Sequence, residues 1–342
     1  MSHVYKLIFS LTLTIGTLIT ISSNSWLGVW MGLEINLLSF IPLMNNSASK
    51  NKSSEAALKY FITQALASMI LLMAMMINSF ISTFPWNFQI ETVTSMCMTT
   101  ALLLKTGAAP FHFWFPEVME GLSWMSALTL LTWQKIAPMA TLMYIHANEN
   151  LLTISLLCST VVGGLMGLNQ TSMRKILSYS SINHLGWMIA AMIFTEILWK
   201  WYFIIYSAMN LMIIWILNKI NISNISQLLA VGSIHPQMKI FLISNFFSMG
   251  GIPPFIGFLP KWLTIQALVT NQMYLVACLL IVITLVTLYF YMRITMPSFN
   301  LSSSSLILST SLTSTLSTKS IFILNSALMG SLLLATLALN WI

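Results

Sequence analysis

Four ionisable side chains lie inside stretches of sequence that are otherwise apolar enough to cross a membrane. They are Glu34, Lys105, Lys135 and Lys261. A lysine at the middle of a bilayer costs roughly 2.5 to 3.5 kcal/mol on insertion scales, so a purely structural helix would exclude it. A buried lysine with one carboxylate partner can take up and release a proton. The pattern therefore indicates proton transfer within the membrane.

Two histidines could extend such a relay, because unperturbed imidazole titrates near pH 6.5. His112 follows Lys105 closely, and His184 lies in the sequence SSINHLG. A structural hydrogen bond is an equally good interpretation of each histidine. Lys261 also has a simpler interpretation, since its four-carbon stem could carry the ammonium group to the membrane surface.

Glycine and proline interrupt the apolar segments that carry Lys105 and Lys261. The interrupting residues are Gly107 and Pro110 in the first segment, and Gly251, Pro253 and Pro254 in the second. Proline removes a backbone donor and clashes with the preceding helical turn. A broken helix survives in a membrane only where protein or water satisfies the freed backbone groups. We therefore expect two helix breaks that face the protein interior.

The two interrupted segments share a pattern. A shift of 144 residues places GxxPFxxxxP at 107–116 onto the same pattern at 251–260. The alternative is chance, because glycine and proline are both common in membrane helices. The two copies lie five predicted spans apart, which reverses their orientation, and inverted repeats with interrupted helices are a transporter architecture. We predict two inverted five-helix repeats, 1–148 and 149–296.

The composition requires a membrane: the chain has 342 residues, of which 57% are hydrophobic and 6% charged. We predict an all-α polytopic protein with about eleven transmembrane helices. The expected spans lie near 4–22, 26–44, 56–82, 95–115, 122–145, 151–168, 174–194, 199–218, 239–269, 273–295 and 321–341. Residues 297–320 are rich in Ser and Thr and are predicted to form a loop. Residues 321–342 would then hold the C-terminal transmembrane helix.

The basic residues outside these spans gather on one side of the predicted membrane. Ten share a side with the N-terminus: Lys6, Lys50, Lys52, Lys59, Arg174, Lys175, Lys219, Lys239, Arg293 and Lys319. Only Lys200 falls on the other side. This bias predicts a positive-side N-terminus, and it explains the basic surplus by membrane topology rather than by nucleic-acid binding.

The sequence offers no ligand set for a metal or a redox centre. Cys97, Cys158 and Cys278 stand singly, without CxxC or a nearby histidine. Phosphate-binding loops, nucleophile elbows and zinc-protease motifs are absent from the sequence. The first apolar run also continues without a cleavage site, so we expect a retained first span. We predict that this chain binds no cofactor and no metal.

Several long motifs resemble one family. They are SNSWLGVWMGLEINLLSFIPLM, LLLKTGAAPFHFWFPEVMEGLSW, TWQKIAPM, GLNQTSMRKILSYSSINHLGWM and GGIPPFIGFLPKW, within residues 24–295. Together they resemble chain 2 of NADH:ubiquinone oxidoreductase, the mitochondrially encoded, antiporter-like membrane subunit family of respiratory complex I. The C-terminal 45 residues resemble nothing distinctive.

The resemblance implies a proton-translocating axis. In the family, a glutamate and three lysines cross the middle of the membrane, and by motif these are Glu34, Lys105, Lys135 and Lys261. It implies that Glu34 pairs with Lys105 and that Lys135 bridges two half-channels. Lys261 would connect toward the exit or the next subunit.

The resemblance also implies a setting. The chain would be a multi-pass protein of the mitochondrial inner membrane, with its N-terminus toward the matrix and its C-terminus toward the intermembrane space. Its partners would be other membrane-arm subunits of complex I, including neighbouring antiporter-like subunits, together with membrane lipids. Flavin mononucleotide, iron–sulfur clusters and ubiquinone would belong to other subunits of the same NADH:ubiquinone reductase.

Two other functions compete with this interpretation. A free-standing monovalent cation/proton antiporter would share the fold, but we expect a denser acidic site there, and this chain has no Asp. A purely structural scaffold is disfavoured because Lys105 and Lys135 are expensive in the membrane.

Overall fold

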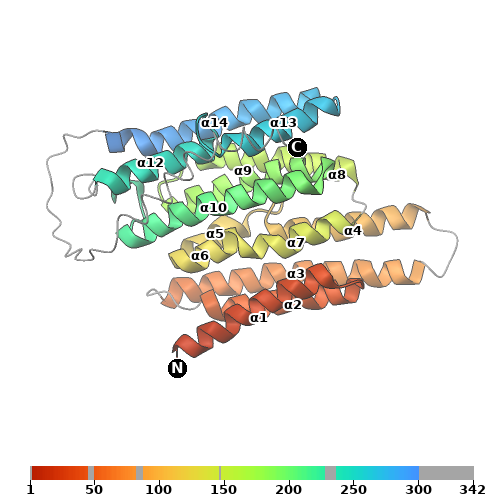
Figure 1. Ribbon diagram of the computed structural model, residues 1–342. Helices are drawn as coiled ribbons and strands as arrows, with labels where there is room; N and C mark the ends of the chain where they lie inside the picture. Colours follow the sequence, from red (N-terminus) through yellow and green to blue (C-terminus); the bar gives the residue numbers. More distant parts are fainter. Residues whose placement is uncertain (1, 45–49, 82–87, 146–147, 228–235, 300–342) are drawn as a thin grey trace.

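The computed structural model describes residues 2–44, 50–81, 88–145, 148–227 and 236–299, and these residues are almost entirely helical. The helices, labelled as in Figure 1, are α1 (Ser2–Ser22), α2 (Trp26–Met44), α3 (Lys50–Ile81), α4 (Phe88–Thr106), α5 (Trp114–Gly121), α6 (Trp124–Leu131), α7 (Trp133–Tyr144), α8 (Glu149–Gly167), α9 (Met173–Phe194), α10 (Glu196–Ile220), α12 (Pro236–Gly250), α13 (Phe258–Thr270) and α14 (Tyr274–Phe299). Within these ranges there is no strand, and the expected all-α class is confirmed.

The helices lie side by side along a common direction and follow one another across the bundle (Figure 1). α1 packs on α2, α2 on α3, and α3 on α4 and α5. In the other half, α8 packs on α9 and α14, and α12 lies between α10 and α14. The halves meet where α5 contacts α9 and α6 contacts α10. This seam places the middle of the chain at the centre of the bundle.

Six of the described helices are long and apolar enough to cross a membrane. They cover Val4–Ser22, Trp26–Met44, Asn51–Phe80, Glu149–Gly167, Glu196–Ile220 and Tyr274–Met296. The predicted spans 122–145 and 239–269 correspond to pairs of shorter helices, and the predicted span 95–115 covers the second half of α4, the break after it and the start of α5. The count of eleven therefore stays a prediction, and its last member, 321–341, lies outside the described residues.

The first predicted helix break follows α4. Gly107 has φ +75°, a conformation in which a side chain would be strained. Its N–H donates to the carbonyls of Leu103 and Leu104 at 3.1 and 3.2 Å, and the N–H of Ala108 also donates to Leu103, at 3.1 Å. This is the Schellman ending that glycine favours at the end of a helix. A turn from Ala108 to Phe111 then leads to α5.

The second predicted break, after α12, has the same bonding pattern 144 residues later. Gly251 has φ +78°. Its N–H donates to Phe247 and Ser248 at 3.1 and 3.0 Å, and the N–H of Ile252 also donates to Phe247, at 3.3 Å. A turn from Ile252 to Phe255 leads to α13. Each break thus ends a helix inside the protein with its last carbonyls partly satisfied.

The span expected at 122–145 contains two helices, and its crossing of the membrane stays a prediction. It divides at Thr132 into α6 and α7. Pro138 lies inside α7 and has no N–H to donate to the carbonyl of Gln134, four residues earlier. The backbone N–H and the hydroxyl of Thr132 both donate to the Leu128 carbonyl, at 3.0 and 2.8 Å. The division places Lys135 in the first turn of a short helix rather than in the middle of a long one.

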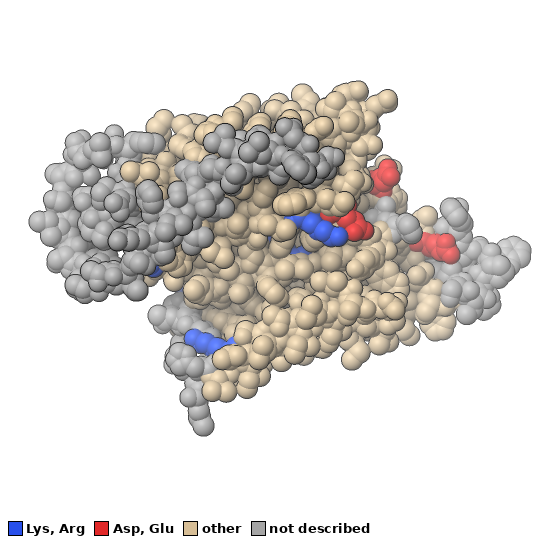
Figure 2. All heavy atoms as spheres, in the orientation of Figure 1, with Lys and Arg blue, Asp and Glu red and all other residues tan. Residues whose placement is uncertain are grey.

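The surface agrees with a lipid environment. In Figure 2 the visible face is mostly uncharged, and the few acidic and basic side chains are scattered. α1, for example, exposes a row of large apolar side chains, including Leu7, Leu11 and Leu18. α14 continues to Phe299, so the loop predicted at 297–320 begins at least three residues later, and the remainder of that loop lies outside the described residues.

Candidate functional site

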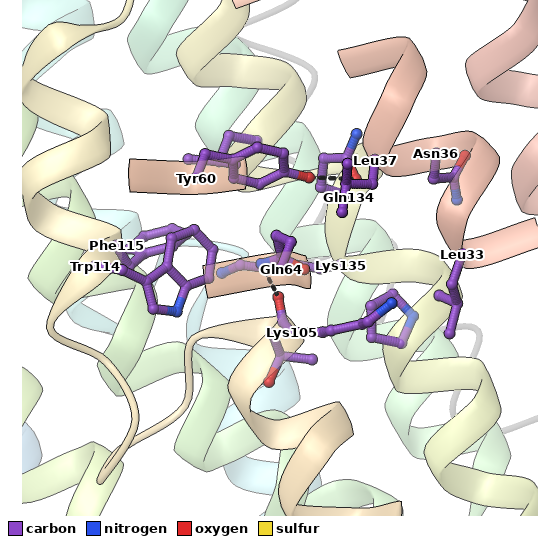
Figure 3. A pocket seen from close by; sticks show the side chains of 13 residues that line it. Leu33, Asn36, Leu37, Tyr60, Gln64, Lys105, Trp114, Phe115, Gln134 and Lys135 are labelled. Atoms are coloured by element: carbon purple, nitrogen blue, oxygen red, sulfur yellow. Dashed lines mark hydrogen bonds between the residues drawn. The ribbon is translucent and has the colours of Figure 1, made fainter. Parts of the chain in front are cut away.

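Lys105 and Lys135 line one small cavity at the centre of the first half of the bundle (Figure 3). Helices α2, α3, α4, α6 and α7 and the first turn of α5 enclose it, and its other polar lining residues are Asn36, Tyr60, Gln64, Thr106 and Gln134. The space open to the centre of a water molecule is about 20 Å³. Since one water needs about 10 to 15 Å³ by this measure, the cavity fits one.

Hydrogen bonds to backbone carbonyls, rather than to the ammonium group, hold Lys105 in place. It lies in the last turn of α4, where helical carbonyls lack partners. The side-chain amide of Gln64 donates to the Lys105 carbonyl at 3.3 Å, and the indole of Trp114 donates to the Leu104 carbonyl at 3.2 Å. Among the described residues no acceptor lies within hydrogen-bond distance of Lys105 Nζ, although the residue is only 6% exposed. Its charge is therefore free to interact with water in the cavity.

Glu34 lies on α2 near this lysine but does not touch it. The Glu34 carboxylate interacts electrostatically with the Lys105 ammonium group. The ion pairs within 4.0 Å in the described part of the chain are Lys59–Glu55, Lys59–Glu117, Lys175–Glu120 and Lys200–Glu196. Glu34 Oε1 is buried without a hydrogen-bond partner. The direct Glu34–Lys105 pair that the resemblance implied is thus absent from this structure.

Two further polar atoms of the cavity residues lack partners. Asn36 Oδ1 and Gln134 Nε2 are both buried without a hydrogen bond among the described residues. Gln134 uses only its oxygen, which accepts from the Tyr60 hydroxyl at 3.4 Å (Figure 3). Asn36 Oδ1 lies beside Gly16 of α1, which does not line the cavity. Gln134 Nε2 is a donor, and a buried polar group of this kind is normally satisfied by ordered water. The cavity is therefore suited to hold a water beside Lys105.

Lys135 lies deeper, at the seam between the halves. Its side chain is 1% exposed, and its Nζ donates to the hydroxyl of Tyr206 on α10 at 3.1 Å. The ammonium nitrogen also lies 4.9 Å from the ring centre of Tyr206 and 5.5 Å from that of Phe115. Aromatic faces stabilise a cation where water is excluded. Lys135 is thus bound to the second half of the protein through one phenol.

His184, on α9, is the next polar side chain beyond Tyr206 in the second half of the bundle. The two rings lie 5.2 Å apart, and His184 Nδ1 shares a 2.9 Å hydrogen bond with the hydroxyl of Tyr202. His184 Nε2 is buried without a partner in the described part of the chain. His184 also interacts electrostatically with both Lys135 and Lys261. The imidazole is therefore near enough to both lysines to be affected by their charge.

Lys261 satisfies the broken end of α12. From the first turn of α13 its Nζ donates to the carbonyls of Met249 and Gly250 at 3.1 and 2.9 Å. A cation at the negative end of a helix is stabilised by the helix dipole as well as by these bonds. The residue is buried, so its ammonium group does not reach the membrane surface as the simpler interpretation assumed.

His112 does not line the cavity that holds the two lysines. It lies in the break after α4, where its Nδ1 is 3.3 Å from the carbonyl oxygen of Pro110. Its ring packs on that of Phe113 at 4.3 Å. These local contacts match the structural interpretation of this histidine.

Sequence reasoning missed the aromatic and amide groups between the charged residues. Tyr202 and Tyr206 lie in a run of α10 that reads as apolar, and Gln64 lies in the middle of α3. Tyrosines four residues apart share one face of a helix, which could have marked them. In the described part of the chain no three His, Cys, Asp or Glu side chains gather as metal ligands.

The chain is similar to proteins of known class. Residues 23–287 match the family described as NADH:quinone oxidoreductase/Mrp antiporter, TM. NADH-ubiquinone oxidoreductase chain 2 of Anopheles gambiae is 48% identical over 304 residues, which cover 88% of each chain. The same subunit of Locusta migratoria is 44% identical over 289 residues, 84% of each chain.

Solved structures agree on the fold. A chain of respiratory complex I from Thermus thermophilus superposes with a TM-score of 0.85 at 24% identity, covering 98% of this chain and 79% of that one. With the family match over most of its length and the identity to its relatives, the chain belongs to the family of NADH-ubiquinone oxidoreductase chain 2.

Proposed function

We propose that the chain translocates protons along a buried axis formed by Glu34, Lys105, Lys135 and Lys261. Membership of the family makes it a proton-translocating membrane subunit of respiratory complex I, the NADH-ubiquinone oxidoreductase. The observation that carries the residue assignment is that Lys105 and Lys135 line one cavity that fits a single water molecule. Two buried amines with water access can exchange a proton.

The path continues through the second half. Lys135 donates to Tyr206, and His184 lies against the Tyr206 ring and interacts electrostatically with Lys261. A phenol and an imidazole can each donate and accept a proton. Tyr206 and His184 therefore join the amine of the first half to that of the second.

Glu34 would control the proton on Lys105. Because the carboxylate lies near but not in contact, a small movement of α2 or α4 could close or widen the gap. An adjacent carboxylate stabilises the ammonium form, and separation in a medium of low dielectric favours the neutral amine. A cycle of approach and separation would load a proton on Lys105 and release it toward Lys135.

The proposed function includes the predicted inverted repeat. Residues 1–148 and 149–296 would form two five-helix units that bring one helix break each to the centre of the membrane. Support comes from the matching hydrogen bonds of the two breaks, whose partners differ by 144 residues at every position. At the break after α4, the carbonyl of Lys105 accepts a hydrogen bond from Gln64. At the break after α12, the ammonium group of Lys261 donates to the carbonyl of Gly250.

The decisive experiment compares two replacements of Lys105 in the assembled complex. Lys105→Met removes the proton carrier, and Lys105→Arg keeps a positive charge that cannot lose its proton. We expect both to assemble and both to lose NADH-driven proton pumping in proteoliposomes. Normal pumping by Lys105→Arg would show that Lys105 is only a fixed charge, and it would refute the axis.

The orientation follows from the charge bias. The N-terminus would face the matrix and the C-terminus the intermembrane space of the mitochondrial inner membrane, because the predicted loops on the N-terminal side carry most of the basic residues. Labelling of Lys52 from the matrix side would support this orientation, and labelling from the opposite side would reverse it. Flavin, iron–sulfur clusters and ubiquinone would be bound by other subunits, and neighbouring antiporter-like subunits would contact this chain.

Cation/proton antiport is the second candidate function. A chain of the Mrp complex from Dietzia superposes with a TM-score of 0.76 at 18% identity, over 84% of this chain and 59% of that one. That likeness concerns the fold. Proton pumping that is unchanged when Na⁺ and K⁺ are replaced by a large organic cation would favour the proton axis over antiport.

A further inference from the structure

A second hollow, of about 380 Å³, opens at the ends of α2, α3 and α4, away from the lysine cavity. Trp26 begins α2, Asn78 is in the last turn of α3, and Glu91 is in the first turn of α4. All three line the hollow. Since α2 and α3 are long and apolar enough to cross a membrane, we expect their ends near the level of the lipid headgroups.

The lining has an apolar part and a charged rim. Leu72, Met75 and the indoles of Trp26 and Trp30 form the apolar part, and Trp30 is fixed because its Nε1 donates to the carbonyl of Ser68 at 3.2 Å. Glu91 supplies a carboxylate that takes part in none of the ion pairs of the described residues. A carboxylate beside two tryptophans is the chemistry that binds an ammonium ion.

The surroundings point to a lipid as the occupant. Leu27 and Met76, which also line the hollow, are 66% and 50% exposed, so it is open to the molecules around the bundle. An anionic headgroup would meet the charge of Glu91. A primary ammonium group has three N–H donors for the Glu91 carboxylate and the Asn78 side-chain oxygen, whereas a trimethylammonium group has none. We propose that this hollow binds phosphatidylethanolamine, with the ammonium group on Glu91 and an acyl chain along Leu72 and Met75.

The test uses the whole complex in nanodiscs of three compositions. They are phosphatidylcholine alone, phosphatidylcholine with phosphatidylethanolamine, and phosphatidylcholine with phosphatidylglycerol. Hydrogen–deuterium exchange of peptides covering residues 72–79 reports occupancy. We expect slower exchange only with phosphatidylethanolamine. Equal protection from exchange in all three compositions, or protection by the anionic lipid, would overturn the proposal. This comparison needs no amino-acid substitution.

Three variants locate the headgroup. Glu91→Gln should lose the protection that depends on phosphatidylethanolamine, and Glu91→Asp should keep it because the carboxylate remains. Glu149→Gln is the matched control, since Glu149 is also an acidic residue in the first turn of a helix but does not line the hollow. Protection that survives Glu91→Gln, or that is lost equally in Glu149→Gln, would show that Glu91 does not bind the ammonium group.

Discussion

Lys135 and Tyr206 form a buried hydrogen bond of 3.1 Å across the seam between the two halves of the bundle. The bond joins α7 to α10, and it is the one hydrogen bond of the Lys135 ammonium group within the described part of the chain. In an interior without water, each hydrogen bond to a buried charge is strong. The phenol therefore influences both the orientation of the ammonium group and how readily that group gives up a proton. The hydrogen bond of Lys135 to the second half therefore depends on one hydroxyl.

Replacing Tyr206 by Phe should reduce proton pumping while the complex still assembles. The ring that packs on Lys135 and His184 is kept, and only the hydroxyl is lost. A hydrogen bond to a charged group contributes about 1.5 to 3 kcal/mol, which corresponds to a more than tenfold change in the balance between the protonated and neutral amine. Proton uptake per NADH oxidised, measured in proteoliposomes, checks this.

A matched control for this variant is Tyr289→Phe. Tyr289 lies on α14 with its side chain 64% exposed, so its hydroxyl has no place in the axis. We expect normal pumping. If Tyr206→Phe pumps as well as Tyr289→Phe does, the hydroxyl of Tyr206 does not link the two halves.

Lys261→Met should lower stability more than Lys105→Met does. Lys261 donates to two carbonyls at the end of α12, and leaving a buried acceptor unsatisfied costs about 1 to 3 kcal/mol. The carbonyls near Lys105 are bonded by Gln64 and Trp114 instead, so they keep their partners when the lysine is replaced. Both variants should stop pumping. The amount of assembled complex after heating, read on native gels, distinguishes them, and equal losses would contradict this role of Lys261.

The charged residues of the axis could be chosen from the sequence because charge inside an apolar segment is costly wherever it occurs. The boundaries of α2 could be predicted for a similar reason, since its apolar run ends at polar residues on both sides. Both helix ends at Gly107 and Gly251 follow from glycine and proline chemistry that acts over a few residues.

What the sequence could not supply is the distance between side chains on different helices. Glu34 and Lys105 are the natural pair by charge, yet the packing of α2 on α3 leaves them without a direct contact. Tyr206 contacts Lys135 although 71 residues separate them, and no local pattern encodes that approach. The division at Thr132 was missed because we judged the segment 122–145 by its length and apolar composition, although Pro138 lies within it.

Gly251→Ala should impair pumping through Lys261. A left-handed conformation costs a residue with a side chain roughly 1 to 2 kcal/mol. The added methyl group would also lie 2.9 Å from Lys261 Cδ and 3.0 Å from its Nζ, closer than normal contacts allow. The end of the lysine side chain must then shift, which disturbs its bonds to the carbonyls of Met249 and Gly250. A pumping assay combined with thermal stability of the complex would detect both effects.

Gly250→Ala tests whether the conformation of Gly251, rather than any added methyl group, causes that loss. Gly250 ends α12 without a positive φ, and a methyl group there would meet Tyr291 and Leu288 at 3.6 and 3.8 Å, which are ordinary contacts. We expect near-normal pumping. Equal damage in both variants would mean that the break is sensitive to packing in general.

Glu34→Gln should reduce pumping without affecting assembly, because Glu34 Oε1 has no hydrogen bond to lose and the amide has nearly the same shape. Its effect should act through Lys105. Glu196→Gln, which breaks an exposed ion pair with Lys200, should leave pumping unchanged. Proton uptake per NADH oxidised checks this. If Glu34→Gln pumps as well as Glu196→Gln does, Glu34 does not control the proton on Lys105.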